Sequence, residues 1–240
     1  MGPFPTAWKD CPAIKSNNPL ECFTCTRQVV PRIPAGRCPN CLQVMHNGHC
    51  TNSDCVDGHN RFGKVYAFGV KGDKLQEAIW AIKDHHDTQA HMAVPLGRIL
   101  AGFILINKRF FEGYDFLLPM PKHPATAREK GFDQIAEIYT VASPYLEGMF
   151  CLEDGAIAPY LIQRKRVPSL RLRSAQERRE LVRDAFCLSF DTGVFGGKRV
   201  LIFDDVITSG ATLSAAAEPL IRAGASAVDG IVLARSQWRK

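Results

Sequence analysis

Hydrophobic residues follow two alternating patterns from about residue 64 onward. Short apolar runs such as KVYAFGV (Lys64–Val70) predict strands, whereas apolar residues three or four positions apart, such as Leu75, Ile79 and Ile82, predict the buried face of a helix. Strands that alternate with helices are typical of a parallel sheet with crossover helices. We therefore expect residues 63–240 to form an α/β domain, with a parallel-sheet core and flanking helices.

The same reasoning predicts the remaining elements of this domain. Further strands are expected at 114–121, 158–162, 199–203 and 227–234, and further helices at 89–108, 135–142, 174–183 and 211–223. Pro95 must kink its helix or lie in its first turn. Ser174 followed by Glu177 is a capping-box pattern that predicts a helix start, and Gly224 predicts a helix end.

Residues 1–62 differ in composition and pattern, because they show little apolar periodicity and are rich in Cys, Pro, Asn and Gly. Such a segment cannot be held together by a hydrophobic core of its own. The chain has 240 residues, 46% of them hydrophobic, so the remainder can bury a sizeable core. We expect two domains, a cysteine-rich zinc-binding segment at 1–62 and a larger domain at 63–240.

No part of the sequence predicts membrane insertion or secretion. The longest apolar stretch, Met92–Ile106, contains Pro95, Gly97 and Arg98 and is shorter than the ~20 residues that a spanning helix needs. The first residues, MGPFPTAWKD, lack the basic, apolar and small-residue regions of a secretory signal. A cytoplasmic location is expected, where closely spaced cysteines bind metal more often than they form disulfides.

Seven of the nine cysteines precede residue 56, and six of them form close pairs. The pairs are Cys22 with Cys25, Cys38 with Cys41, and Cys50 with Cys55. Pairs at this spacing present two thiolates to one tetrahedral Zn²⁺, and four protein ligands would make the zinc structural. The middle pair can share an ion with either of the others, and a second ion would need His46, His49, His59 or Cys11, although any single histidine is more simply a surface side chain.

The stretch VLIFDDVITSGAT contains an apolar run followed by Asp204 and Asp205 and then by hydroxyl residues around Gly210. Ligands of parallel sheets bind outside the carboxyl ends of the strands, and the start of the next helix is a site for an anion such as phosphate. Either aspartate alone would be a common helix cap. The loop lacks the lysine of a nucleotide-binding P-loop, so a phosphosugar fits better than a nucleoside triphosphate.

This stretch resembles the phosphoribosyl pyrophosphate (PRPP) motif of type I phosphoribosyltransferases. The resemblance implies that fold for residues 63–240. It also implies that Asp204 and Asp205 are catalytic residues whose carboxylates bind the ribose hydroxyls. The PRPP-binding residues that it implies are Asp204, Asp205, Val206, Ile207, Thr208, Ser209, Gly210, Ala211 and Thr212.

Two further stretches, YDFLLPMPKHPATAREKGFDQ and LIQRKRVPSLRLRSAQERRELVRDAF, together with the cysteine-rich segment, resemble the ComF family within that superfamily. The first implies a pyrophosphate loop with Pro121, Lys122 and Arg128, and it carries Asp133 where the family pattern has Asn. The second implies a mobile lid with Arg164, Lys165 and Arg166. Basic residues of these kinds are otherwise solvated surface side chains.

The resemblance implies a phosphoribosyltransferase that binds PRPP with Mg²⁺ and transfers phosphoribosyl to an unidentified nitrogen acceptor. The alternative is an accessory protein of DNA uptake that holds single-stranded nucleic acid, with competence proteins as partners and a PRPP site that is regulatory or vestigial. The formal net charge is +6, and Arg164–Arg183 contains eight basic residues, which suits contacts with phosphates.

Overall fold

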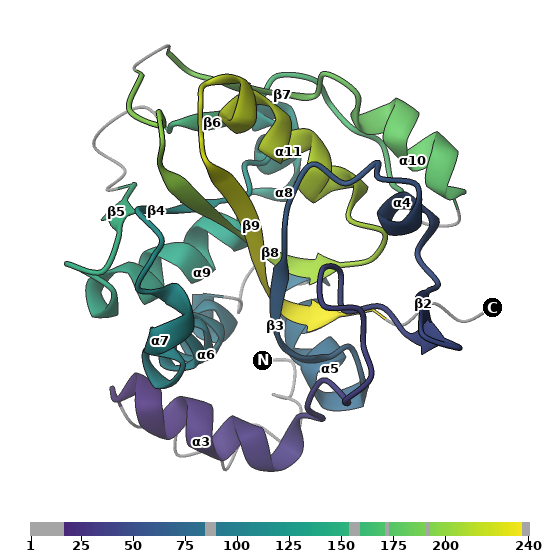
Figure 1. The fold of residues 1–240 in the computed structure, drawn as a ribbon. Helices are drawn as coiled ribbons and strands as arrows, with labels where there is room; N and C mark the ends of the chain where they lie inside the picture. Colours follow the sequence, from purple (N-terminus) through teal and green to yellow (C-terminus); the bar gives the residue numbers. More distant parts are fainter. Residues whose placement is uncertain (1–16, 85–89, 154–158, 171–172, 191–192, 237–240) are drawn as a thin grey trace.

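The computed structural model describes residues 17–84, 90–153, 159–170, 173–190 and 193–236. A five-stranded sheet runs through the centre of these residues, with the strand order β3-β9-β8-β4-β5 (Figure 1). Every neighbouring pair is parallel, as expected for an α/β domain. The strands are β3 (Val65–Val70), β4 (Phe116–Pro119), β5 (Cys151–Leu152), β8 (Arg199–Ile207) and β9 (Ala227–Arg235).

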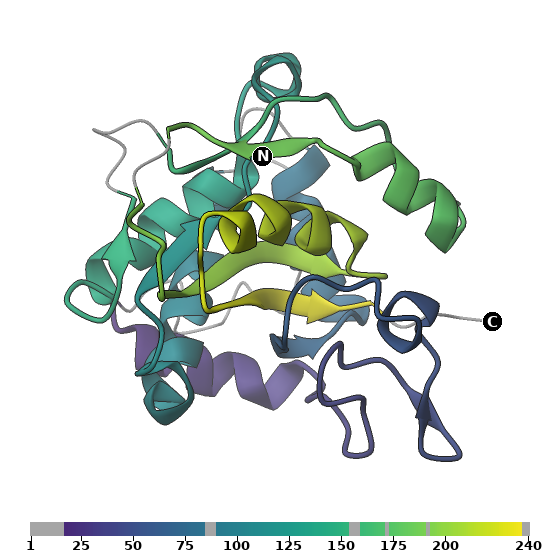
Figure 2. The ribbon, with the colours of Figure 1, turned by 45° about the horizontal axis from the view of Figure 1, so that its top comes forward.

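Helices cover both faces of this sheet, which confirms the predicted fold class. They are α5 (Asp73–Asp84), α6 (Ala90–Ile106), α7 (Lys108–Phe111), α8 (Pro124–Lys130), α9 (Gln134–Ala142), the short 3₁₀ helix η1 (Ser143–Tyr145), α10 (Ala175–Val182) and α11 (Ala211–Arg222). Figure 2 shows α11 lying over β8 and β9 on one face, while the helix α3 (Pro19–Val29) lies on the other side. None of the helices in the described parts of the chain is long and apolar enough to cross a membrane.

Several local sequence signals lead to the elements that they predicted. Ser174 caps α10 in a capping box with Glu177. Ile135 and Ile138 lie on the buried face of α9. Gly224 follows α11 with a positive φ of 88°, a conformation that glycine adopts without strain. Of the two positions predicted for Pro95, the structure shows the one inside the helix, since Pro95 is the sixth residue of α6.

β8 is longer than the sequence predicts. The expected strand ended at Phe203, but the observed one continues through both aspartates to Ile207. The reason is its neighbour, since Asp204 pairs with Val232 and Ile207 pairs with Arg235 in the ladder with β9. Backbone pairing with a long partner therefore outweighs the low strand preference of aspartate.

The helix α3 was not predicted from the sequence, because its buried face packs against residues that are far away in the sequence. The ring of Phe23 stacks on Phe103 of α6 with a centroid distance of 6.2 Å and meets Phe68 of β3 edge-on at 5.6 Å. A Cβ atom at Gly102 of α6 would lie 2.2 Å from the carbonyl oxygen of Pro19, so this glycine allows the two helices to approach closely. The structure thus joins part of the cysteine-rich segment to the larger domain.

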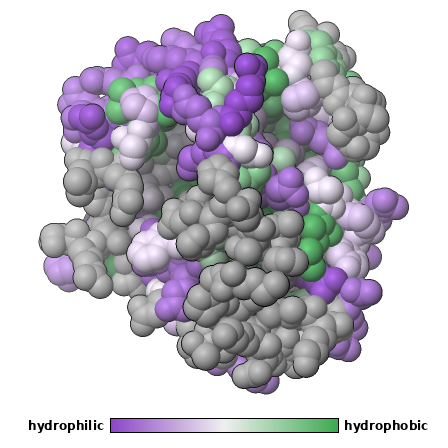
Figure 3. Space-filling model, turned by 180° about the vertical axis from the view of Figure 1, so that it is seen from behind, coloured by the Kyte–Doolittle hydropathy of each residue, from purple (hydrophilic) through white to green (hydrophobic). Residues whose placement is uncertain are grey.

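The remaining elements within the described residues are two small antiparallel strand pairs and one short helix. β1 (Met45–His46) pairs with β2 (His49–Cys50), and α4 (Ser53–Val56) follows. β6 (Leu161–Gln163) pairs with β7 (Phe186–Leu188) to form what we call the hairpin. The first residue of the strand expected at 158–162 lies outside the described residues. In Figure 3, which shows the molecule from behind, hydrophilic side chains gather towards the top, the level at which β6, β7 and α10 lie in Figure 1.

Candidate functional site

A cavity of about 360 Å³ lies at the carboxyl edge of the sheet, where β8 passes into α11. Its wall consists of Lys71, Leu170, Arg178, Asp204, Val206, Ile207, Thr208, Ser209, Gly210, Ala211, Thr212, Leu213, Val232 and Ser236. The loop predicted to bind phosphate therefore forms one side of a real cavity. Ligands of parallel sheets are expected at this edge.

The two adjacent aspartates point to opposite faces of β8, because successive side chains of a strand alternate. Asp204 lines the cavity together with Val206. Asp205 is buried and accepts a hydrogen bond of 2.8 Å from Nε2 of Gln134, the first residue of α9. The sequence treated the two carboxylates as equivalent, whereas the structure gives only Asp204 a place in the wall of this cavity.

Residues 208–212, which we call the anion loop, connect β8 to α11. Gly210 is the N-cap of α11 with a φ of 93°, and it has no side chain to satisfy the first amides of the helix. The Oγ of Ser209 accepts a hydrogen bond of 3.3 Å from the amide of Ala211. The start of a twelve-residue helix, with its positive dipole end, faces the cavity and favours a negatively charged group there.

Two cationic residues in the cavity wall were not singled out from the sequence. Lys71 follows β3 directly, and Arg178 belongs to α10. Burial lowers the pKa of Arg178, and the carboxylate of Asp54 opposes that shift. The signal for Lys71 was present, because it is the first residue beyond the carboxyl end of a predicted strand, and such positions belong to the ligand edge of the sheet. The position of Arg178 depends on the docking of α10 and has no such signal.

The predicted pyrophosphate loop is only partly a loop, since Pro124–Lys130 forms α8. Pro121 and Lys122 precede this helix after β4, and Arg128 is exposed in its last turn. Burial lowers the pKa of Lys122, while the carboxylates of Asp133 and Asp205 oppose the shift. Lys122 therefore lies beside the Asp205 face of β8, and it is not among the residues that line the 360 Å³ cavity.

Asp133, which stands where the family pattern has Asn, caps α9. Its Oδ1 accepts hydrogen bonds from the amides of Ile135 and Ala136, at 3.0 and 3.3 Å. The Nζ of Lys122 lies 3.6 Å from the same oxygen. Because Asp and Asn are equally good N-caps, the substitution preserves the helix start.

The three residues of the predicted lid lie at the exit of the hairpin. All three are exposed. The backbone amide of Arg164 donates to the carbonyl of Ala185, which extends the hairpin pairing by one residue. Arg166 forms a two-pronged ion pair with Glu129 of α8, with N–O distances of 2.7 and 2.5 Å. Lys165 lies between them in the chain, and none of the three lines the 360 Å³ cavity.

Four thiols come together away from this cavity, those of Cys38, Cys41, Cys50 and Cys55, which we call the cysteine cluster. All four sulfur atoms lie within 4.8 Å of one another. Two of the distances are 3.8 Å, between Cys38 and Cys55, and 3.5 Å, between Cys41 and Cys50. These are too long for disulfides but fit a zinc tetrahedron, in which Zn–S bonds of about 2.3 Å separate the sulfurs by about 3.8 Å. The cysteine cluster thus fits a structural zinc ion.

Of the two ligand sets that the sequence left open, the structure assembles the one without Cys22 and Cys25. These two residues lie in α3, where Cys22 is fully buried and packs against Cys25. Burial raises the pKa of Cys22, with an opposing effect from Arg98 of α6. The three histidines considered for a second ion, His46, His49 and His59, are exposed, and Cys11 lies outside the described residues.

Comparison with known proteins finds two relatives that match most of the chain. No protein-family model matches the chain. Competence protein F of Haemophilus influenzae is 25% identical over 218 residues, which cover 90% of this chain and 90% of the relative. Competence protein ComFC of Streptococcus pneumoniae is 23% identical over 226 residues, which cover 92% of this chain and 90% of the relative. Both matches cover nine-tenths of the chain, and they support the resemblance to the ComF family that the sequence motifs indicate.

Proposed function

We propose that the protein binds phosphoribosyl pyrophosphate together with Mg²⁺ in the 360 Å³ cavity. The observation that carries this proposal is the joint presence of a carboxylate, two cations and a helix start in the wall of one cavity. Asp204 would accept hydrogen bonds from the ribose hydroxyls, and the anion loop would hold the 5′-phosphate. Lys71 and Arg178 would neutralise further phosphate charge.

If transfer follows binding, the bond from ribose C1 to the pyrophosphate oxygen breaks and a nitrogen atom of the acceptor forms the new bond. The cavity wall offers fixed charges for this step, and such preorganised charges stabilise the separating pyrophosphate. Among the residues in this wall, the side chains suit positioning and electrostatic catalysis rather than attack as a nucleophile. The proposed activity is therefore phosphoribosyl transfer.

Calorimetric titration of the zinc-loaded chain with PRPP and Mg²⁺ tests this proposal. Asp204→Asn removes the charge that would accept the ribose hydroxyls, so the affinity is expected to fall about tenfold, a typical effect of one charge-assisted hydrogen bond. Asp57→Asn, at an exposed position of the cysteine-rich segment, is the matched control and should bind like the wild type. Absence of binding by the wild type would refute the proposal, and equal binding by Asp204→Asn would refute the role of this residue.

A groove favours a second function, contact with single-stranded nucleic acid. This arginine groove has a volume of about 780 Å³ and lies between α4, α10, α11 and the hairpin. It is lined by Arg61, Arg164, Arg179, Arg183 and Arg222, with Asp54, Asp184 and Glu218 as its acidic members. The names of the two relatives refer to competence, and we infer a role for this chain in DNA uptake on the cytoplasmic side, with other competence proteins as partners.

A further inference from the structure

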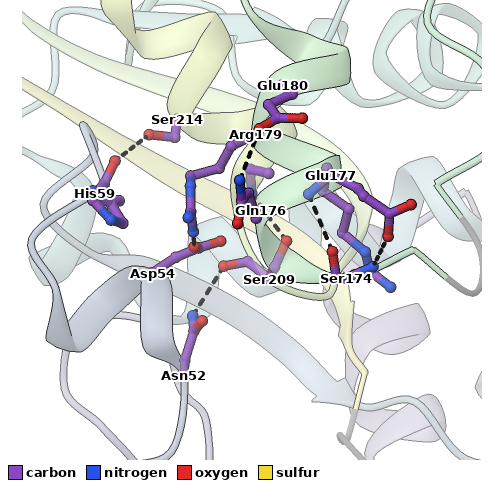
Figure 4. Close-up of polar contacts among 12 residues, drawn as sticks. Asn52, Asp54, His59, Ser174, Gln176, Glu177, Arg179, Glu180, Ser209 and Ser214 are labelled. Atoms are coloured by element: carbon purple, nitrogen blue, oxygen red, sulfur yellow. Dashed lines mark hydrogen bonds and ion pairs between the residues drawn. The ribbon is translucent and has the colours of Figure 1, made fainter.

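The stretch that follows the cysteine cluster makes direct contact with the anion loop. Asn52 lies between Cys50 and Cys55, and its Nδ2 donates a hydrogen bond of 2.9 Å to the carbonyl oxygen of Ser209 (Figure 4). Both residues are buried, with 2% and 3% of their surface exposed. A residue held between two cluster thiols thus contacts the backbone of the loop that faces the cavity.

The side chain of Asn52 does not cap the helix that it precedes. Asn52 is the N-cap of α4, where asparagine usually accepts a hydrogen bond from the helix amides. Here its side chain makes no cap hydrogen bond. Its backbone amide instead donates to the sulfur of Cys50 at 3.4 Å. The cluster therefore fixes the backbone of Asn52 while the side chain is directed to Ser209.

A second contact lies on the helix side of the anion loop. The Oγ of Ser214, in the first turn of α11, donates to the carbonyl of His59 at 3.1 Å and accepts from the amide of Arg61 at 2.8 Å. The ring of Phe62 lies directly beside Gly210, because a Cβ atom there would be 2.8 Å from two ring carbons. The chain after the cluster thus follows the loop and the start of α11.

Arg235 connects the cluster to the strand side of the loop. It is 1% exposed, and its Nη1 donates to the carbonyl oxygen of Ile207 at 2.9 Å and also to that of Thr208. It is also near enough to the thiols of the cluster for an electrostatic interaction. A zinc ion with four thiolates has a net negative charge, which would stabilise this buried guanidinium.

We propose that the cysteine cluster, when it holds its metal ion, keeps the anion loop in the conformation that binds phosphate, and that Asn52 is the positioning residue between them. The expected effect of Asn52 on affinity rests on the proposed binding of PRPP. The expected effect of Asn52 on the conformation of the anion loop does not. Loss of the Asn52 donor releases the carbonyl of Ser209. The loop amides then sample other orientations, and binding must reorder them.

The test uses the zinc-loaded full chain with Asn52→Ala, and with Asn52→Leu as a second neutral variant that fills the space without a donor. Hydrogen–deuterium exchange of residues 207–213 is measured first, and calorimetric affinity for PRPP with Mg²⁺ second. Both variants should retain the zinc content of the wild type, exchange the loop amides about tenfold faster and bind PRPP about tenfold more weakly, as expected for one lost hydrogen bond.

Thr51→Val is the matched control. It removes a hydrogen bond of 2.8 Å from Thr51 to the carbonyl of Val44, which lies wholly within the cysteine-rich segment. Its loop exchange and affinity should equal those of the wild type, which separates a role in positioning from general damage to the segment.

Unchanged loop exchange in zinc-loaded Asn52→Ala and Asn52→Leu would overturn the proposal, and so would loss of zinc from both variants, because Asn52 would then act on the metal site. A wild type that fails to bind PRPP would refute the proposed function alone, since the exchange measurement still decides whether Asn52 positions the loop.

Discussion

Gly210 connects the anion loop to α11 in a backbone conformation that other residues adopt only with strain. Its φ is 93°, and a Cβ atom would lie 2.8 Å from two carbons of the Phe62 ring. Gly210→Ala therefore adds backbone strain and a steric clash at one position. We expect it to lower the free energy of unfolding by about 2–5 kcal/mol in urea titrations, the sum of a left-handed backbone penalty and overpacking.

Gly148→Ala separates the two contributions. Gly148 also has a positive φ, 78°, but a Cβ atom there would meet nothing within 4 Å. This control should lose only about 1–2 kcal/mol, the backbone penalty. Equal losses in the two variants would show that the contact with Phe62 imposes no constraint on the loop.

The sequence predicted some of the residues that line the 360 Å³ cavity, but not the directions in which their side chains point. Asp204 and the anion loop were recognised because an apolar run, a carboxylate and a glycine-containing loop follow one another within one short stretch. The separation of Asp204 from Asp205 was missed, because it depends on the extension of β8 beside β9. Because β8 continues through both aspartates, their side chains alternate, and one faces the cavity while the other faces α9. The two-aspartate motif alone does not show how far the strand extends.

At the scale of elements, Glu153 connects the end of β5 to the beginning of the hairpin. Its carboxylate accepts a hydrogen bond of 2.9 Å from the amide of Tyr160. Burial raises the pKa of Glu153 from 4.5 to about 7, against the effect of hydrogen bonds from Tyr160 and Leu161. The folded protein therefore holds the proton of Glu153 more tightly than the unfolded chain does. The contribution of this proton to the free energy of unfolding is complete below pH 4.5 and is lost as the pH rises to about 7.

Glu153→Gln keeps an acceptor oxygen and removes the titration. We expect the melting temperature of the wild type, relative to that of this variant, to be lower at pH 8 than at pH 5. Glu147→Gln, an exposed position in the same region, controls for the change in net charge. A difference between wild type and Glu153→Gln that is the same at both pH values would contradict the expectation.

Elements with local signals were predicted, and elements that depend on distant partners were not. The capping box of Ser174 and Glu177 is contained within one helical turn, and α10 begins where it predicts. α8 was missed because the resemblance implied a loop that includes Arg128, although Pro124 lies in the first turn of α8, where proline is favoured. α3 was missed because its packing surface is provided by α6 and β3.

At the scale of the whole molecule, the arginine groove brings together residues from Asp54 to Arg222. Phosphate contacts release counterions, so binding of single-stranded DNA should weaken as salt rises. Arg183 is exposed and lines the groove. In fluorescence anisotropy with an unstructured oligonucleotide, Arg183→Ala should reduce the slope of log K against log salt by about 0.7, the contribution of one contact to a single strand.

Arg109→Ala provides the control, because Arg109 is also exposed but belongs to α7 and lies against Phe110 outside the groove. Its salt slope should equal that of the wild type. If both variants changed the slope equally, DNA binding would depend on overall charge and not on this groove.

The packing of α3 on α6 also refines the division of the chain that the sequence predicts at residue 62. We propose that the part held mainly by metal is the stretch around the cysteine cluster, whereas α3 depends on apolar contacts with the larger domain. The aromatic contacts of Phe23 with Phe68 and Phe103 support this assignment.

The pairing of β3 with β9 also has a consequence for the order of folding. Val65 pairs with Gly230, so β3 can join the sheet only after β9 has formed. Contacts this distant in sequence close slowly, because the entropy of a long loop must be lost first. Arg235, whose side chain donates to Ile207 and Thr208, arrives with that strand. On a ribosome, the anion loop would therefore take its final conformation only after β9 has emerged.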